Sequence, residues 1–149
     1  MKNGIIFILA CIVTLAACQD EADCTSVTTD FANLQFYELE SGETDTAVVV
    51  NSIKPIDSDS ILVSETTISG TIQLPLNANE TSTAFVFETE FGRDTLVLSY
   101  TVSTRLISED CGLEVLFTEL ESIRTDFDSV RIVNDILVED INEDIRIYH

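Results

Sequence analysis

The sequence predicts an all-β protein: a single antiparallel β-sandwich of about eight strands, with an immunoglobulin-like arrangement favoured. From Asn33 onward, apolar and polar residues alternate with the period of two that marks half-buried strands. Turn-forming clusters separate the alternating runs at roughly the 8–12-residue spacing of sandwiches and barrels. A short glycine-containing connection, Gly92-Arg93-Asp94, joins two of the runs and predicts a β-hairpin. The chain has no Trp, so it lacks the buried tryptophan of immunoglobulin domains and its topology stays open.

The candidate strands follow from this alternation. In residues 67–76 the large apolar side chains share one face, and Ser, Thr and Gln share the other. Residues 85–91 and 95–103 repeat the pattern on the two sides of the predicted hairpin. Residues 116–124 could instead form a helical turn, but the alternation that begins at Leu113 favours a strand. The remaining candidates are residues 34–39, 46–53, 60–63, 113–120, 129–133 and 144–148.

The N-terminal residues predict a bacterial lipoprotein signal peptide. Lys2 supplies a positive start, and an almost continuous apolar run ends in Leu15-Ala16-Ala17-Cys18. The run is shorter than the roughly 20 apolar residues that span a bilayer. An ordinary secretory signal would also end in small residues, but it would leave a reactive thiol at the cut. We therefore expect residues 1–17 to be removed and Cys18 to carry a lipid that anchors the protein in the membrane.

Residues 18–32 are expected to tether Cys18 to a sandwich domain of residues 33–149. Within this tether, Asp20, Glu21 and Asp23 form either a solvated spacer or a sorting signal. The tract resembles the acidic export tracts of surface-exposed Bacteroidetes lipoproteins. Gln19 also differs from the Asp that retains enterobacterial lipoproteins in the inner membrane. We expect an outer-membrane anchor with the domain on the cell surface, or otherwise on the periplasmic face.

The cysteines divide into two groups. Cys11 leaves with the signal peptide and Cys18 takes the lipid, so Cys24 and Cys111 remain. Two thiols in an exported chain are most simply interpreted as a disulfide. The alternative is two separate thiols. The absence of a C-x-x-C motif argues against a zinc or redox site.

The strong acidity of the chain excludes one class of partner. It contains 27 acidic and 7 basic residues, for a net charge of −20, and cleavage after Ala17 would make it one unit more negative by removing Lys2. Nucleic-acid binding needs basic side chains that neutralise phosphates, so no nucleic acid is expected as a partner. The same charge disfavours anionic lipid headgroups, so membrane attachment would depend on the acyl anchor.

The sequence predicts that the protein is not an enzyme. Its one histidine is His149, at a chain end of the kind that is often mobile. Lys54 precedes Pro55 in a predicted turn and is best interpreted as a surface charge. The motifs G-x-S-x-G and H-E-x-x-H are absent. Carboxylate pairs are common in so acidic a chain, so they do not single out a glycosidase site.

Calcium is the one cofactor considered, because carboxylates supply its oxygen ligands. Asp57-Ser58-Asp59-Ser60 begins like a calcium loop, but Leu62 and Ile68 stand where an EF-hand needs Gly and Glu. A second oxygen-rich cluster precedes the last candidate strand. Solvated acidic turns are the favoured interpretation of both clusters, and no cofactor is expected otherwise. The candidate calcium ligands are Asp57, Asp59, Glu139, Asp140 and Asp144.

Three short segments carry a family resemblance. They are residues 94–100 (DTLVLSY), 108–112 (SEDCG) and 145–148 (IRIY). Together they resemble a family of short Bacteroidetes lipoproteins of unknown function, which share a lipobox, a second Cys soon after it and a late Cys-Gly pair. Some members carry an automated calcium-binding label, which the broken loop at Asp57 argues against carrying over. The resemblance implies the location and the Cys24–Cys111 pairing, and no activity.

These observations predict a lipid-anchored, surface-exposed outer-membrane protein. We expect a non-enzymatic binding or assembly module whose partner is an unidentified protein or glycan. One alternative is a periplasm-facing accessory subunit of an outer-membrane complex. Another is a domain that binds calcium weakly and depends on it for ligand binding.

Overall fold

The computed structural model describes residue 24 and residues 26–44, 47–139 and 143–149. Within these residues, no helix is long and apolar enough to cross a bilayer. The regular elements in this described part of the chain are nine strands: β1 (Phe31–Tyr37), β2 (Val48–Pro55), β3 (Val63–Ile68), β4 (Ile72–Pro75), β5 (Ser82–Thr89), β6 (Gly92–Ser108), β7 (Gly112–Thr125), β8 (Ser129–Ile132) and β9 (Ile145–Tyr148).

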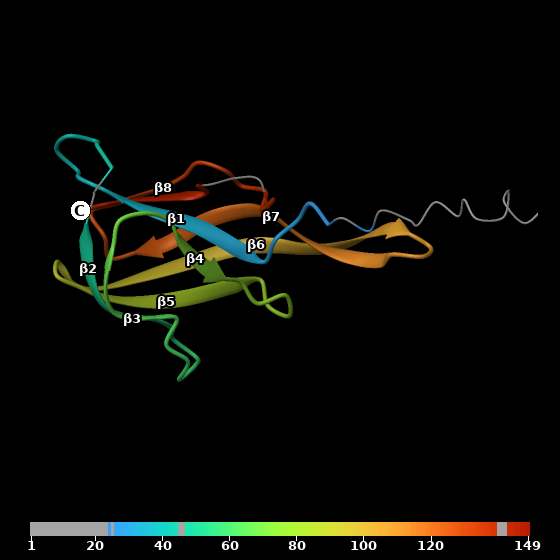
Figure 1. Ribbon diagram of the computed structural model, residues 1–149, viewed down its shortest axis with the longest axis horizontal. Coiled ribbons are helices and arrows are strands. Elements are labelled where there is room, and N and C mark those ends of the chain that lie inside the picture. Colours follow the sequence, from blue (N-terminus) through green and yellow to red (C-terminus); the bar gives the residue numbers. More distant parts are fainter. Residues whose placement is uncertain (1–23, 25, 45–46, 140–142) are drawn as a thin grey trace, which may run out of the picture.

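The strands form two sheets that pack face to face, which confirms the predicted β-sandwich (Figure 1). One sheet has four strands in the order β4-β1-β9-β8, and the other has five in the order β3-β2-β5-β6-β7. This is not the immunoglobulin order, in which the first, second, fifth and fourth strands share a sheet. The favoured immunoglobulin-like arrangement is therefore corrected to a different topology within the sandwich class.

One strand pair is parallel. β1 and β9 run in the same direction, with Leu34 opposite Ile145 and Phe36 opposite Ile147. All the other strand pairs described are antiparallel. The prediction of a purely antiparallel sandwich was wrong at this pair, because alternation reports which face of a strand is buried and not the direction of its neighbour.

The core lies between the two sheets and is built from alternating inward-facing side chains. Phe36, Phe87 and Phe127 pack edge to face at its centre, with ring centroids 5.3–6.4 Å apart. Tyr100 is also buried, and its hydroxyl donates a hydrogen bond to the Asn77 carbonyl at 3.0 Å. The largest side chains with no more than about 2% exposure are Phe85, Phe87, Phe117, Leu34, Ile53, Leu74, Leu96, Leu98, Leu120, Leu137, Ile145 and Ile147.

The run predicted as one strand at residues 67–76 is divided between the sheets. β3 ends at Ile68 in the five-stranded sheet, and β4 begins at Ile72 in the four-stranded sheet. Apolar residues keep their alternation across the break, because both strands face the same core from opposite sides. The predicted strand at residues 60–63 was also wrong, since regular structure begins only at Val63.

The predicted hairpin is confirmed as β5–β6, with Phe85 opposite Leu96. Its turn consists of Glu90 and Phe91, because Thr89 lies opposite Gly92. Gly92-Arg93-Asp94 therefore begins β6 and does not form the connection. The predicted strand at residues 113–120 is also confirmed, and it extends as far as Thr125 in β7.

β6 and β7 continue past the sandwich as a two-stranded arm, which extends to the right in Figure 1. We use "the arm" for residues 102–117. Val102 lies opposite Phe117 at its base, and Leu106 lies opposite Leu113 near its tip. The arm was not predicted from the alternation, because polar and apolar residues are mixed between the two predicted strands. The arm places the turn at residues 109–111 at its tip.

The outer edge of β7 is covered by two other segments of the chain. The Thr28 hydroxyl donates to the Val115 carbonyl at 2.9 Å, and the Leu137 amide donates to the Phe117 carbonyl at 3.0 Å. The Leu120 amide in turn donates to the Asp135 carbonyl at 3.1 Å. An uncovered edge strand would offer its backbone groups to other chains. These contacts close much of that edge.

Candidate functional site

An open groove lies between the arm and the beginning of β1. Its volume is about 730 Å³, within the range of ligand-binding pockets. Phe31 and Val115 supply apolar lining, while Thr29, Asn33 and Gln73 add hydroxyl and amide groups. The groove therefore combines an aromatic ring with several hydrogen-bonding side chains. It is the candidate binding site.

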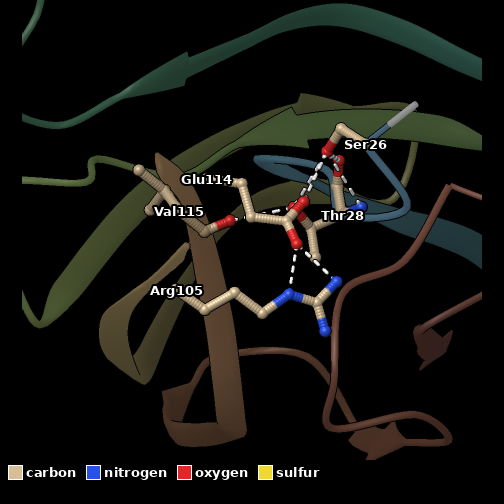
Figure 2. A network of polar contacts seen from close by, with 5 residues as sticks. All are labelled: Ser26, Thr28, Arg105, Glu114 and Val115. Atoms are coloured by element: carbon tan, nitrogen blue, oxygen red, sulfur yellow. Dashed lines mark hydrogen bonds and ion pairs between the residues drawn. The ribbon is translucent and has the colours of Figure 1, made fainter. Parts of the chain in front are cut away.

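Glu114 lies in the wall of this groove, with its side chain 5% exposed. Figure 2 shows its carboxylate between Ser26 and Thr28 on one side and Arg105 on the other. The Ser26 hydroxyl donates to Glu114 Oε2 at 2.9 Å, and Arg105 forms an ion pair with Oε1. The hydrogen bond from Ser26 lowers the pKa of Glu114, and the Arg105 guanidinium acts in the same direction, while burial opposes both. The carboxylate is therefore held ionised in a structural contact.

Residues 26–28 are attached to the arm through this carboxylate. The single hydroxyl proton of Thr28 lies between two acceptors, Glu114 Oε2 at 3.2 Å and the Val115 carbonyl at 2.9 Å. Thr28 also forms a β-bridge with Val138. With β1 starting at Phe31, the folded part begins earlier than the predicted domain boundary at residue 33.

The predicted disulfide between Cys24 and Cys111 is confirmed. The two Cα atoms are 5.3 Å apart, and the bridge spans 87 positions of sequence. Cys111 lies in the turn at the tip of the arm, where its amide donates to the Ser108 hydroxyl at 3.0 Å. The bridge therefore ties residue 24 to the arm tip, a short distance from the Glu114 contacts.

Glu114, Ser26 and Thr28 were not among the predicted site residues. The alternation predicted that Glu114 faces solvent from its strand. Residues 26–28 were predicted to belong to the tether. A signal was nevertheless present. A bridge from Cys24 to Cys111 brings the hydroxyl-rich residues after Cys24 next to the residues that follow Cys111.

The candidate calcium ligands that the structure describes do not converge. Among the described residues, no group of three or more His, Cys, Asp or Glu side chains is placed to hold a metal ion. Asp57 and Asp59 are exposed after β2, and Glu139 lines the groove. Five of the predicted site residues lie outside the described part of the chain: Cys18, Asp20, Glu21, Asp23 and Asp140.

Asp144 is 1% exposed and serves as a structural connector. Its carboxylate accepts hydrogen bonds from the Asn33 amide at 2.7 Å and from Asn134 Nδ2 at 2.8 Å. Burial raises the pKa of Asp144, although both hydrogen bonds act against this. The neighbouring Glu143 accepts from the Tyr37 hydroxyl at 2.6 Å and pairs with Arg146 at 2.8 Å. These carboxylates hold β1, β9 and the chain before β9 together.

His149 is held in place, contrary to the expectation of a mobile end. Its ring stacks on Phe91, with centroids 3.6 Å apart. Its amide donates to the Tyr37 carbonyl at 3.2 Å, and its carbonyl accepts from the Leu39 amide at 3.0 Å. The imidazole therefore caps the core beside the β5–β6 turn.

Fold and site together define a class: an all-β sandwich with a disulfide-braced arm and an open groove at the base of that arm. The chain belongs to a family of unknown function (DUF6452), whose profile matches residues 44–149. Comparisons with curated proteins and with solved structures find no match. The family establishes kinship and assigns no activity.

The free energy of unfolding is expected to rise as the pH is lowered from 7 towards 4. Burial, followed by the negative charges of Asp126 and Asp128, raises the pKa of Asp94 above its ordinary 3.8. Burial also raises the pKa of Asp144. Both groups bind a proton more tightly in the folded state, so stability is gained as the pH falls through their folded pKa values. The pKa of Glu114 is lowered, so its effect on stability has the opposite pH dependence. That stabilising effect is lost only below the ordinary pKa of 4.5.

Urea unfolding midpoints between pH 7 and pH 4 test this expectation. The Asp94→Asn variant should show a weaker pH dependence than the parent chain. Glu121→Gln removes a negative charge from an exposed site on β7, so it serves as the matched control. A midpoint that falls steadily between pH 7 and pH 5 would contradict the expected sign.

Replacing Glu114 by alanine is expected to loosen residues 26–28 while the disulfide still retains them. Ser26, Thr28 and Arg105 all lose their carboxylate partner. The readout is the Glu139 amide, which donates to the Val27 carbonyl at 3.1 Å. Its hydrogen exchange should become about tenfold faster, because local opening costs less. Glu121→Ala is the control on the same strand, and equal exchange rates in the two variants would disprove the role of Glu114.

Proposed function

We propose that this chain is an outer-membrane lipoprotein, displayed on the cell surface, that acts as a non-enzymatic binding or assembly module. The observation that carries the proposal is the segment Leu15-Ala16-Ala17-Cys18, in which two small residues precede a cysteine after an apolar run. The disulfide supports it, because such bridges persist in oxidising compartments outside the cytoplasm. The family resemblance to short Bacteroidetes lipoproteins points the same way.

A binding role is supported by the groove at the base of the arm. Its lining pairs the aromatic ring of Phe31 with the side chains of Thr29, Asn33 and Gln73. Such a mixture suits a glycan or a short protein segment, which offers both apolar faces and hydrogen-bonding groups. The net charge of −20 favours a neutral or basic partner by charge complementarity.

A non-enzymatic role is supported by what the buried ionisable groups do. Glu114 pairs with Arg105 and two hydroxyls, and Asp144 connects backbone segments. His149 stacks on Phe91 beside the β5–β6 turn. Each of these groups is engaged in holding the fold, whereas a catalytic group must be aimed at a substrate.

Labelling of cells with a fatty-acid analogue tests the anchor. The parent chain should incorporate the label and sediment with membranes, and Cys18→Ser should do neither. Cys11→Ser is the matched control, because it changes a cysteine that the signal peptide removes. An unlabelled parent chain would overturn the lipoprotein proposal.

Protease treatment of intact cells tests the surface location. The parent chain should be cut on intact cells, while a periplasmic marker protein survives. Survival of the chain on intact cells, together with cleavage after permeabilisation, would instead support a periplasm-facing accessory subunit. The permeabilised sample is needed because a folded sandwich can resist proteases by itself.

A further inference from the structure

We propose that the tip of the arm rests on the lipid bilayer that holds the chain's own anchor, with Leu106 and Leu113 at the boundary of headgroups and acyl chains. The inference rests on the proposed lipidation of Cys18. It adds an orientation and a second membrane contact to that proposal. Three features of the molecule lead to it.

The first feature is an exposed apolar pair. Leu106 and Leu113 are direct partners across the arm, so their side chains lie on the same face. They are 59% and 69% exposed, and Leu113 is the most exposed large apolar side chain in the described part of the chain. Val115, 38% exposed, continues this face, and both Leu113 and Val115 line the groove. The apolar lining of the sandwich therefore continues past the sandwich to the arm tip without a cover.

The second feature is the position of the disulfide. Cys111 lies in the tip turn, two positions before Leu113, and its Cα is 5.3 Å from that of Cys24. Cys24 follows Cys18 by six positions. An extended chain spans at most about 3.6 Å per residue, so Cys18 lies within about 22 Å of Cys24. The bridge therefore holds the apolar pair close to the lipidated residue.

The third feature is the position of another exposed apolar residue, Ile123. Ile123 is also on β7 and is 59% exposed, but it lies ten positions beyond Leu113. At about 3.3 Å per residue this separates the two side chains by about 33 Å along the strand. The short tether thus favours contact at the tip and not at Ile123, which makes Ile123 a matched control.

The charge of the arm tip determines which lipid headgroups it can approach. The tip turn contains Glu109 and Asp110, so anionic headgroups would repel it and a zwitterionic surface suits it better. Two leucines bind a bilayer weakly by themselves. A covalent anchor changes this, because it keeps the tip at a high effective concentration beside the membrane. The contact is therefore expected in the lipidated chain and not in a soluble one.

The absence of tryptophan from the chain makes the test direct. The lipidated Leu113→Trp variant is reconstituted into phosphatidylcholine vesicles with or without bromine on the acyl chains. A side chain about 5–10 Å deep at the interface lies within reach of the bromines, so its fluorescence should fall by about half. The lipidated Ile123→Trp variant in the same vesicles should keep its intensity.

The outcomes separate the two proposals. Parent chain that carries no lipid and does not float with the vesicles would overturn the lipoprotein proposal, and the orientation with it. A lipidated chain that floats, but whose Leu113→Trp fluorescence is no more quenched than that of Ile123→Trp, would overturn the orientation alone. Both substitutions are at exposed sites, so the fold should tolerate them, and unfolding midpoints close to the parent value verify this.

Discussion

Replacing Phe87 by alanine is expected to lower the free energy of unfolding by about 3–5 kcal/mol. Phe87 is fully buried, and its ring packs edge to face against Phe36 and Phe127. The three rings come from β5, from β1 and from the segment between β7 and β8, so they join the two sheets. Removing the central ring leaves a cavity that strands fixed by hydrogen bonds cannot collapse to fill.

Urea unfolding of the two variants Phe87→Ala and Phe91→Ala measures this effect. Phe91 is 46% exposed in the β5–β6 turn, so it loses the same atoms with less apolar area returned to water. Its variant should lose less than half as much stability. A loss below about 1 kcal/mol for Phe87→Ala would show that this core is loosely packed at its centre.

Removal of the Cys24–Cys111 bridge is expected to cost about 4.5 kcal/mol of unfolding free energy. The bridge closes a loop of 87 positions, and restricting an unfolded chain of that length accounts for this magnitude. Residues 26–28 should also separate more easily from the arm, because only noncovalent contacts, those with Glu114 and with the Val115 carbonyl, then attach them to it.

The comparison uses a chain that begins at Gln19, in which Cys24 and Cys111 are either intact or both replaced by serine. Urea midpoints with and without a reductant give the effect. Reduction should destabilise the parent and leave the double variant unchanged. Equal stability of the oxidised parent and the double variant would mean that the cross-link does not restrict the unfolded state.

Much of the fold could be predicted, because most of the strands bury one face, although β3 and β8 contain no fully buried residue. Leu96, Leu98 and Tyr100 lie in the core, and they alternate with Val97 and Ser99, which are only half-buried. What alternation cannot report is the identity of the neighbouring strand. The parallel pairing of β1 with β9 and the crossing between Ile68 and Ile72 both depend on contacts between distant segments. Both features were therefore identified only from the structure.

The candidate site was predictable only in part. The cysteine pair followed from counting thiols in an exported chain. The burial of Glu114 did not, because the side chains that cover it come from residues 26–28, more than eighty positions away. A carboxylate on the polar face of a strand is ordinarily solvated. The disulfide and the backbone pairing of residues 27–28 with residues 138–139 bring the covering segment into place.

The pairing of β1 with β9 also affects the timing of folding. β9 lies between β1 and β8, and its residues Ile145 and Ile147 are fully buried. Until β9 leaves the ribosome, β1 lacks the neighbouring strand on one of its edges. β8 then has no strand that could connect it to the four-stranded sheet. We therefore expect the nascent chain to stay unfolded through most of its synthesis, and then to fold slowly because its contacts span the whole sequence. A chain in that state is suited to threading across a membrane before it folds.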